Sequence, residues 1–257
     1  MIEDSQNRSV GAMLEEAWDV SKTVVIAVGI TLFVRFFFVQ PFNIPSASME
    51  PTLLTGDFII VDNIDYGYSK ASLIFPLTRL PLEGRLFSDG PGRGEVAVFK
   101  NANDRNKDYV KRIVGLPGDT IQVIGGILHV NGQPVTRELI PGAETTCGAY
   151  APDGLRYRET MPFDGPTYTV QECHGDRWRL DNTAPVTVPE GHYFGMGDNR
   201  DNSVDSRTSS VRTIPHDQLV GRARRVAFSV DGARGRIWQI WRWPMAIRYG
   251  RIGEKID

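Results

Sequence analysis

Hydrophobic and polar positions follow two different patterns along the chain, and the change between them falls near residue 40. Residues 23–39 form an apolar run whose only charge is Arg35, close to its end. A membrane-spanning helix needs about 17–25 such residues, and an arginine near the end can extend its charge to the interface. The run therefore predicts one transmembrane helix, although a helix buried in a protein core is an alternative.

Beyond residue 40, short segments rich in β-branched residues are separated by glycine, asparagine and proline. The clearest of these segments cover residues 58–61, 96–99, 109–114, 120–124 and 127–130. The last two flank Gly125-Gly126, a pair typical of a hairpin turn. This pattern predicts a mainly β fold, with a β-sandwich or distorted barrel that follows one N-terminal transmembrane helix.

The same patterns divide the chain into three predicted parts. They are an N-terminal segment over residues 1–22, the transmembrane helix over residues 23–39 and a β domain over residues 40–257. Within the β domain, residues 68–93 have weak periodicity and are expected to form an extended loop or hairpin. Approximately residues 122–190, rich in proline, glycine and threonine, are expected to form an inserted β-subdomain.

Composition and charge narrow the class of protein. Hydrophobic residues make up 41% of the chain and charged residues 23%, which is typical of a globular protein. The net charge of -2 argues against a nucleic-acid partner, which usually needs a basic face. The basic cluster at residues 222–225 is interpreted as solvated or ion-paired surface.

Two cysteines, Cys147 and Cys173, are the only ones in the chain. An exported domain would permit a disulfide between them, which we expect, and two free buried thiols are the alternative. The C-terminal residues 237–245 carry three tryptophans, which either lie at a membrane interface or close the β core.

Two serines just beyond the apolar run are candidates for chemistry. Ser46 and Ser48 flank one alanine, and a serine becomes a strong nucleophile only when a base takes its proton. The same small-x-small pattern could instead be the cleavage site of a signal peptide, so that the mature chain would begin at Met49. The long acidic leading segment and Arg35 argue against that alternative.

A lysine is the best candidate for the base. The four histidines show no acid–histidine–serine pattern and are interpreted as surface or structural residues, whereas serine–lysine pairs are a known variant. Lys111 alternates with Tyr109 and Ile113 in an apolar strand, so it shares their face. Burial there would lower its pKa and supply a neutral amine. A lysine that reaches solvent from a sheet edge is the alternative.

Four segments then resemble the signature blocks of the bacterial type I signal peptidases. Residues 44–53 read IPSASMEPTL, residues 94–100 GEVAVFK, residues 109–119 YVKRIVGLPGD and residues 197–207 GDNRDNSVDSR. They occur in the family's order behind an N-terminal span, and the resemblance extends from about residue 23 to the end. Ala47 stands where glycine is frequent in the family.

The resemblance implies a role for each matching residue. Ser48 would be the nucleophile and Lys111 the general base, while Ser46 would stabilise the oxyanion together with the Ser48 backbone N–H. Ser203 would orient the amine of Lys111. Two supporting ion pairs are implied, Asp205 with Arg207 and Arg112 with Asp198. Arg200 and Asp201 are interpreted as a solvated turn.

The resemblance also implies the substrate and the location. The family removes N-terminal signal peptides from exported preproteins after a small-x-small site such as Ala-x-Ala, at the bacterial inner membrane with the catalytic domain on the periplasmic side. Such selectivity needs shallow apolar pockets that exclude large side chains. The expected pocket wall consists of Phe42, Ile44, Met49, Leu53, Tyr109 and Val110.

The expected partners are preprotein signal peptides and membrane lipid, and the chain is expected to act as a monomer without a cofactor. No metal is expected, because no histidine, cysteine and aspartate cluster has ligand spacing. Charge gives little information on orientation, since only Arg8 and Lys22 precede the span. Two alternatives remain: a serine–lysine peptidase specialised for one partner or for self-cleavage, and a non-catalytic anchored β domain.

Overall fold

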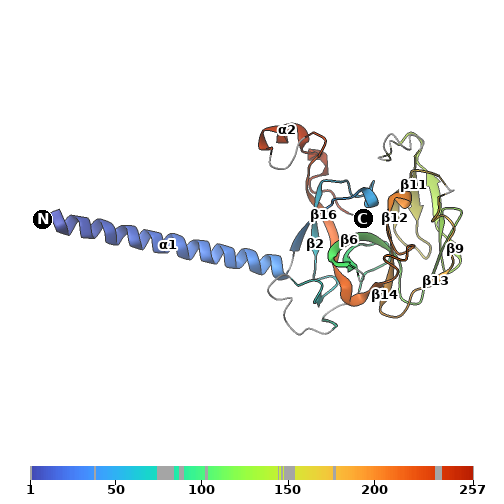
Figure 1. Ribbon diagram of the computed structural model, residues 1–257, viewed down its shortest axis with the longest axis horizontal. Helices are drawn as coiled ribbons and strands as arrows, with labels where there is room; N and C mark the ends of the chain where they lie inside the picture. The colour runs from blue at the N-terminus through green and yellow to red at the C-terminus, as the bar shows by residue number, and fades with distance from the viewer. Residues whose placement is uncertain are drawn as a thin grey trace. The chain divides into compact units, whose positions relative to one another are not determined.

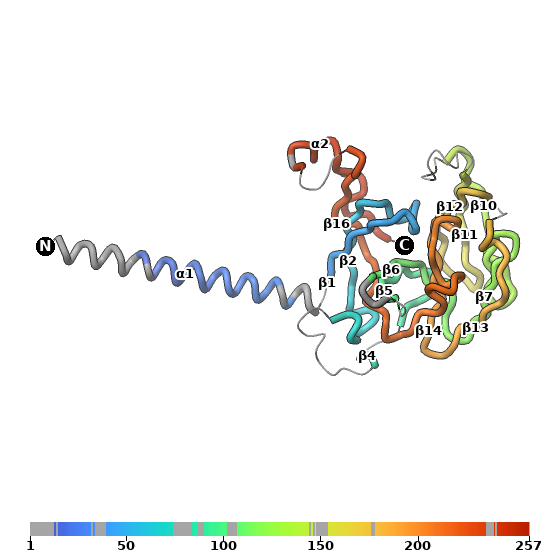
Figure 2. Tube along the Cα trace, viewed as in Figure 1, coloured from blue at the N-terminus to red at the C-terminus, as the bar shows by residue number. Residues whose placement is uncertain are grey.

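The structure of the protein is a computed structural model, and its chain divides into two compact units, Met1–Val39 and Gln40–Asp257. The structure describes residues 2–37, 39–73, 84–86, 90–101, 104–143, 145, 147, 154–175, 178–234 and 239–256. Figure 2 traces the path of the chain from the N-terminus to the C-terminus.

The first unit is one long helix, α1 (Ile2–Phe37), which continues through both the predicted N-terminal segment and most of the predicted span. The hydroxyls of Ser21, Thr23 and Thr31 donate to carbonyls one turn earlier, which satisfies these polar groups within the helix. Its exposed apolar side chains include Val24, Val25, Ile26, Val28, Ile30 and Phe33. Within the described residues, no helix is both long and apolar enough to cross a membrane. Phe38, in the predicted span, lies outside the described residues.

The second unit is built on a seven-stranded sheet with the order β1-β2-β16-β5-β6-β14-β15. Its strands are β1 (Val39–Asn43), β2 (Asp57–Asp62), β16 (Leu219–Ser229), β5 (Val96–Asn101), β6 (Asp104–Gly115), β14 (His192–Met196) and β15 (Ile214–Pro215). The pairs from β2 to β15 are antiparallel. β6 lies between β5 and β14, so it is an interior strand of the sheet.

Two smaller sheets occupy most of the segment predicted to be an inserted subdomain. One contains β10 (Thr136–Leu139), β11 (Leu155–Thr160) and β12 (Thr167–Glu172), and the other contains β13 (Val186–Thr187), β7 (Thr120–Ile124), β8 (Ile127–Val130) and β9 (Gln133–Pro134). Figure 1 shows both on the β14 side of the large sheet. Buried side chains from β7, β8, β12 and β14 form one apolar cluster, which joins the small sheets to the large one.

The remaining regular elements are short. β3 (Tyr68–Ser69) pairs with β4 (Arg85–Leu86), inside the region predicted to be a loop or hairpin. The short helices are η1 (Ala47–Met49), η3 (Arg200–Asn202), η4 (His216–Gln218), η5 (Ile240–Arg242), α2 (Trp243–Ala246) and η6 (Tyr249–Arg251). The prediction of a mainly β fold is thus confirmed for the second unit.

Candidate active site

The turn that carries Ser48 is anchored by apolar side chains on both sides. Ile44 and Met49 are buried in the cluster beneath β2, β5 and β16, and the backbone N–H of Ile44 donates to the Asp57 carbonyl at 2.8 Å. Between these anchors, η1 turns the backbone so that Ser48 is only half-buried and Ser46 is exposed. The hydroxyl of Ser48 is therefore held on a fixed turn at the edge of the core.

Lys111 reaches this serine from β6. Its Nζ lies 2.8 Å from Ser48 Oγ, although the two residues are 63 positions apart, and it donates to the Val110 carbonyl at 2.7 Å. The residue is only 3% exposed. Burial lowers the pKa of Lys111 to about 8, and the carboxylates of Asp205 and Asp198 oppose this shift only in part.

A glycine on the neighbouring strand makes room for the lysine. Gly195 of β14 lies against β6, and a Cβ at this position would lie 3.1 Å from Lys111 Cβ and 2.9 Å from Ile214 Cδ1. Any larger side chain would therefore press on the lysine and on the core behind it. The lysine occupies a close-packed site and not a sheet edge.

Ser46 and Ser203 lie near the pair in different ways. Ser46 Oγ is 3.4 Å from Ser48 Oγ. Ser203 Oγ is buried and forms no hydrogen bond of standard geometry among the described residues, but it faces Asp205 and helps to lower the pKa of that carboxyl. The structure therefore shows no hydrogen bond between Ser203 and Lys111, whose amine donates to Ser48 Oγ and to the Val110 carbonyl. A Cβ at Gly197 would meet both Ser203 Oγ and the Ser48 carbonyl oxygen, so the two lie against the same glycine.

Both predicted ion pairs are formed behind the serine and lysine, and both are buried. Arg112 donates to Asp198 from Nε at 2.8 Å and from Nη2 at 2.7 Å. Arg207 donates to Asp205 from Nε and from Nη2, each at 2.9 Å. Burial alone would raise the pKa of Asp205, but Arg207 and the backbone N–H of Gly197 bring it below its usual value.

The interpretation of Arg200 and Asp201 as a solvated turn is wrong. Arg200 is 2% exposed and forms an ion pair with Glu159 of β11. Asp201 is buried, and its Oδ2 accepts hydrogen bonds from the backbone N–H groups of Cys173, at 2.7 Å, and His174, at 2.6 Å. Glu159 of β11 and Cys173 at the end of β12 cover this turn. Because both residues are far from the turn in the sequence, local patterns could not predict these contacts.

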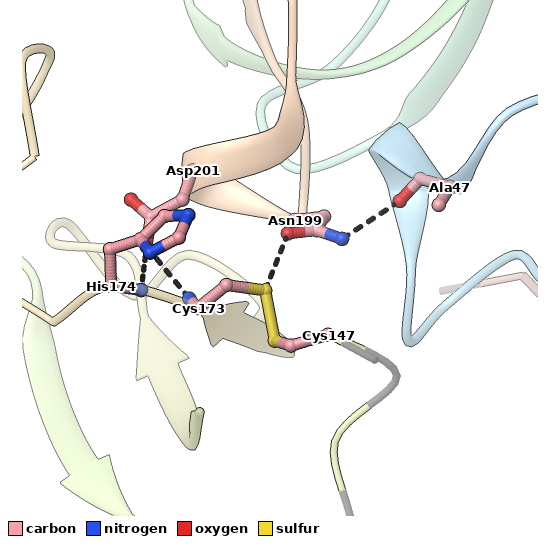
Figure 3. The surroundings of a disulfide bond; sticks show 6 residues. All are labelled: Ala47, Cys147, Cys173, His174, Asn199 and Asp201. Carbon is pink, nitrogen blue, oxygen red and sulfur yellow. Dashed lines mark hydrogen bonds between the residues drawn. A yellow bond between two sulfur atoms is a disulfide. The ribbon is translucent and has the colours of Figure 1, made fainter. Parts of the chain in front are cut away.

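Cys147 and Cys173 form a disulfide with an S–S distance of 2.04 Å. Figure 3 shows it beside Asn199 and Asp201, with the side chain of Asn199 directed at the carbonyl of Ala47. The bridge therefore lies next to the turn that meets η1, a proximity that no periodic pattern or motif in the sequence indicates.

A cavity of about 780 Å³ adjoins the serine and lysine. Its lining includes Phe42, Ile44, Met49, Tyr109 and Val110 of the predicted wall, together with Ser46, Ser48 and Lys111. Leu53 is not part of this lining: it is fully buried in the core cluster beneath the η1 turn, so its prediction as a wall residue is wrong. Sequence reasoning missed further lining residues, namely Pro41, Asn43, Pro45, Lys107, Asp108, Asn202 and Val204.

The two C-terminal tryptophans that the structure describes differ in their surroundings. Trp243 packs against Phe228, with ring centroids 5.8 Å apart, whereas Trp241 is 70% exposed. Trp238 lies outside the described residues.

Among the residues that the structure describes, no group of three or more histidine, cysteine, aspartate or glutamate side chains could hold a metal ion.

Comparison with known proteins agrees with the resemblance of the signature blocks. The family described as "Signal peptidase, peptidase S26" matches residues 17–228. Signal peptidase I of Rickettsia akari is 34% identical over 93% of this chain and 91% of its own length, and that of Rickettsia conorii is 32% identical over 98% and 97%. A crystal structure of a signal peptidase I from Enterococcus faecalis V583 is similar at a TM-score of 0.30 and 23% identity, over 51% of this chain and 95% of that one. The chain therefore belongs to the signal peptidase family, peptidase S26, and is a serine peptidase.

Proposed function

We propose that the protein is a membrane-anchored endopeptidase that removes N-terminal signal peptides from exported preproteins after a small-x-small site. Ser48 is the nucleophile and Lys111 is the general base. The observation that carries this proposal is the 2.8 Å separation of Lys111 Nζ and Ser48 Oγ at a buried position. The names of the relatives, Signal peptidase I, support the choice of substrate.

The shifted pKa of Lys111 makes it a usable base near neutral pH. At a pKa of about 8, about a tenth of the amine is neutral at pH 7, against about one part in three thousand at the ordinary value of 10.5. The neutral amine accepts the proton of the Ser48 hydroxyl as the oxygen attacks the scissile carbonyl. The resulting ammonium then gives that proton to the leaving amine, and a water attacks the acyl-enzyme with Lys111 again as base.

The negative charge on the tetrahedral intermediate needs donors at the same turn. The backbone N–H of Ser48 and the hydroxyl of Ser46 supply them in this proposal, and the short distance between the two serines supports it. Removal of one such donor has cost about 2.7–4 kcal/mol of transition-state stabilisation in a well-studied serine protease.

The cavity beside Ser48 and Lys111 would receive the substrate residues that precede the scissile bond. Phe42 and Ile44 line it from one side and Tyr109 and Val110 from another, so its walls are apolar where a small side chain would enter. An extended peptide could lie along these segments and pair with their backbone, which leaves selectivity to the pockets. Bulky side chains would meet the walls, in agreement with a small-x-small preference.

Membrane anchoring through α1 completes the proposal, with the peptidase unit on the periplasmic side of the bacterial inner membrane. The exposed apolar side chains of the helix, such as Val25 at 70% and Ile26 at 61%, support it. An anchor would keep the enzyme and its lipid-embedded substrates on one surface. Alkaline carbonate extraction of membranes from cells that express the full chain tests the anchor, because a peripheral protein would be released.

Cleavage of a purified preprotein in trans tests the function. Wild-type protein should cleave a preprotein with an Ala-x-Ala site and should fail when leucine replaces the last alanine. Ser48→Ala and Lys111→Ala should abolish cleavage, whereas Ser209→Ala and Lys70→Ala, both at exposed positions, should cleave normally. Normal cleavage by either dyad variant would contradict the mechanism. Cleavage of one preprotein alone among many would favour an enzyme specialised for one partner.

A further inference from the structure

Asn199 joins the turn before η3 to the turn that carries the nucleophile. Its backbone N–H donates to the Ser48 carbonyl at 3.2 Å, and its side-chain Nδ2 donates to the Ala47 carbonyl at 3.0 Å. The residue is 1% exposed. Two successive carbonyls of the nucleophile turn are thus held by one residue that lies about 150 positions further along the chain.

The orientation of the Asn199 amide is determined by its two neighbours. Its Oδ1 lies 3.6 Å from Cys173 Sγ, a disulfide sulfur that has no proton to donate. Rotating the amide by half a turn would place Oδ1 against the Ala47 carbonyl oxygen, and two acceptors would then repel each other. The observed orientation, with Nδ2 toward Ala47, is therefore the only one that forms the bond (Figure 3).

The backbone around Asn199 is itself held by β12. Gln171 forms a parallel bridge with Asn199, and its N–H donates to the Asp198 carbonyl at 2.9 Å. Asp201, two residues on, accepts from the N–H groups of Cys173 and His174. Asn199 therefore approaches the nucleophile turn from a support that is fastened on both sides.

The bond to Ala47 bears on the oxyanion donor through the geometry of the peptide unit. The Ala47 carbonyl and the Ser48 N–H belong to the same planar peptide group, so fixing the oxygen also fixes the direction of the N–H. A hydrogen bond to the oxygen also polarises the group and makes its N–H a better donor. The second bond, to the Ser48 carbonyl, restrains the peptide unit that follows.

We propose that Asn199 is a positioning residue, which sets the Ser48 peptide N–H in the direction of the substrate oxyanion. This role rests on the proposed function, in which that N–H stabilises the tetrahedral intermediate. Asn199 forms no hydrogen bond with Lys111 and does not itself line the cavity, so we expect its effect on the rate of the chemical step and not on substrate binding or on the base.

Kinetics of Asn199→Ala and Asn199→Leu test the role, with Asn182→Ala as the matched control. Leucine keeps the branching of asparagine at Cγ and lacks the donor, while alanine removes the donor without adding bulk. Asn182 is exposed and accepts from the Gly125 N–H in a small sheet. Both Asn199 variants should lose about 10- to 100-fold in kcat, per mole of folded protein, while KM changes less than about threefold. The ascending limb of the pH profile should stay in place, because Lys111 is unchanged. The control should match wild type.

A double variant separates positioning from a loss of structure. Asn199→Leu combined with Ser46→Ala should lose less than the product of the two single losses, because both changes weaken the same oxyanion site. Unchanged kcat in both Asn199 variants, a shifted pH limb, or fully multiplicative losses would overturn the proposal. Normal cleavage by Ser48→Ala in the same assay would instead overturn the proposed function, so the two failures are distinguishable.

Discussion

Lys111 Nζ and Ser48 Oγ lie 2.8 Å apart, and the lysine that makes this contact is buried on an interior strand of the large sheet. The contact and the burial have separate effects. The short distance allows direct proton transfer, whereas burial determines how much of the amine is neutral. Each effect can be changed by itself through a different substitution.

The first prediction concerns the pH dependence of cleavage. The ascending limb of kcat/KM should lie near pH 8, the pKa of Lys111, and not near pH 10.5. Asp205→Asn should move the limb to lower pH, because the Asp205 carboxylate raises the pKa of the lysine. Initial rates with a substrate that does not titrate between pH 6 and pH 11 provide the measurement. A limb near pH 10 would show that the lysine is solvated when it acts.

The second prediction concerns stability. The folded pKa of Lys111 is lower than the unfolded one, so the unfolded chain binds more protons between about pH 8 and pH 10.5. The free energy of unfolding should rise across this window, and below it the buried ammonium costs about 3 kcal/mol. Lys111→Met should therefore raise the free energy of unfolding at pH 7 by about 1–3 kcal/mol while it abolishes cleavage. Urea unfolding at pH 7 and pH 10 checks this, and parallel pH slopes in the two proteins would contradict it.

The third prediction concerns the glycine beside the lysine. Gly195→Ala should lower kcat about 10- to 100-fold, because the new Cβ would press on Lys111 and Ile214 and shift the amine from Ser48. Gly232→Ala is the control, since a Cβ there meets nothing within 4 Å. Steady-state kinetics of the two variants give the comparison. Equal activity in both would mean that the packing around the lysine can adjust without moving it.

The fourth prediction compares a buried ion pair with an exposed one. Asp198→Asn leaves Arg112 buried without its carboxylate and should lower the free energy of unfolding by about 3–5 kcal/mol. Glu138→Gln breaks an exposed pair, in which the side chain of Glu138 is 66% exposed and that of Arg158 is 58% exposed. It should lower the free energy of unfolding by less than about 1 kcal/mol. Denaturant titration measures both. Similar losses would indicate that the site tolerates an unpaired Arg112.

The contact between Lys111 and Ser48 was predictable from the sequence, because the lysine carries a local signal. Lys111 shares a face with Tyr109 and Ile113, and a lysine on an apolar face is unusual enough to suggest burial. The order of the signature blocks added the pairing with Ser48, which alternation cannot give. The mainly β class followed from short β-branched segments, whereas the order of the seven strands depends on long-range pairing that no local pattern contains.

The errors arose where a residue's surroundings come from distant segments. Leu53 is apolar and close to Ser48 in sequence, and those two properties do not distinguish a cavity wall from the core beneath it. Arg200 and Asp201 lie in a polar turn, but β11 and the end of β12 cover them with Glu159 and Cys173. Asn199 lies in the block at residues 197–207 but was given no role, because a turn asparagine is common and its partner is a backbone carbonyl.

Formation of the disulfide determines when the support of the nucleophile turn is fully assembled. Cys147 and Cys173 close a loop at the end of β12, where the Cys173 N–H holds Asp201 and its sulfur packs on Asn199. Such bonds form and persist in oxidising compartments and are rare in the cytosol. A newly made chain in the cytosol would thus carry the serine and the lysine before the support of the nucleophile turn is locked. With the peptidase unit on the periplasmic side, as proposed above, the finished arrangement would be reached only after this unit had crossed the bilayer, in an oxidising compartment.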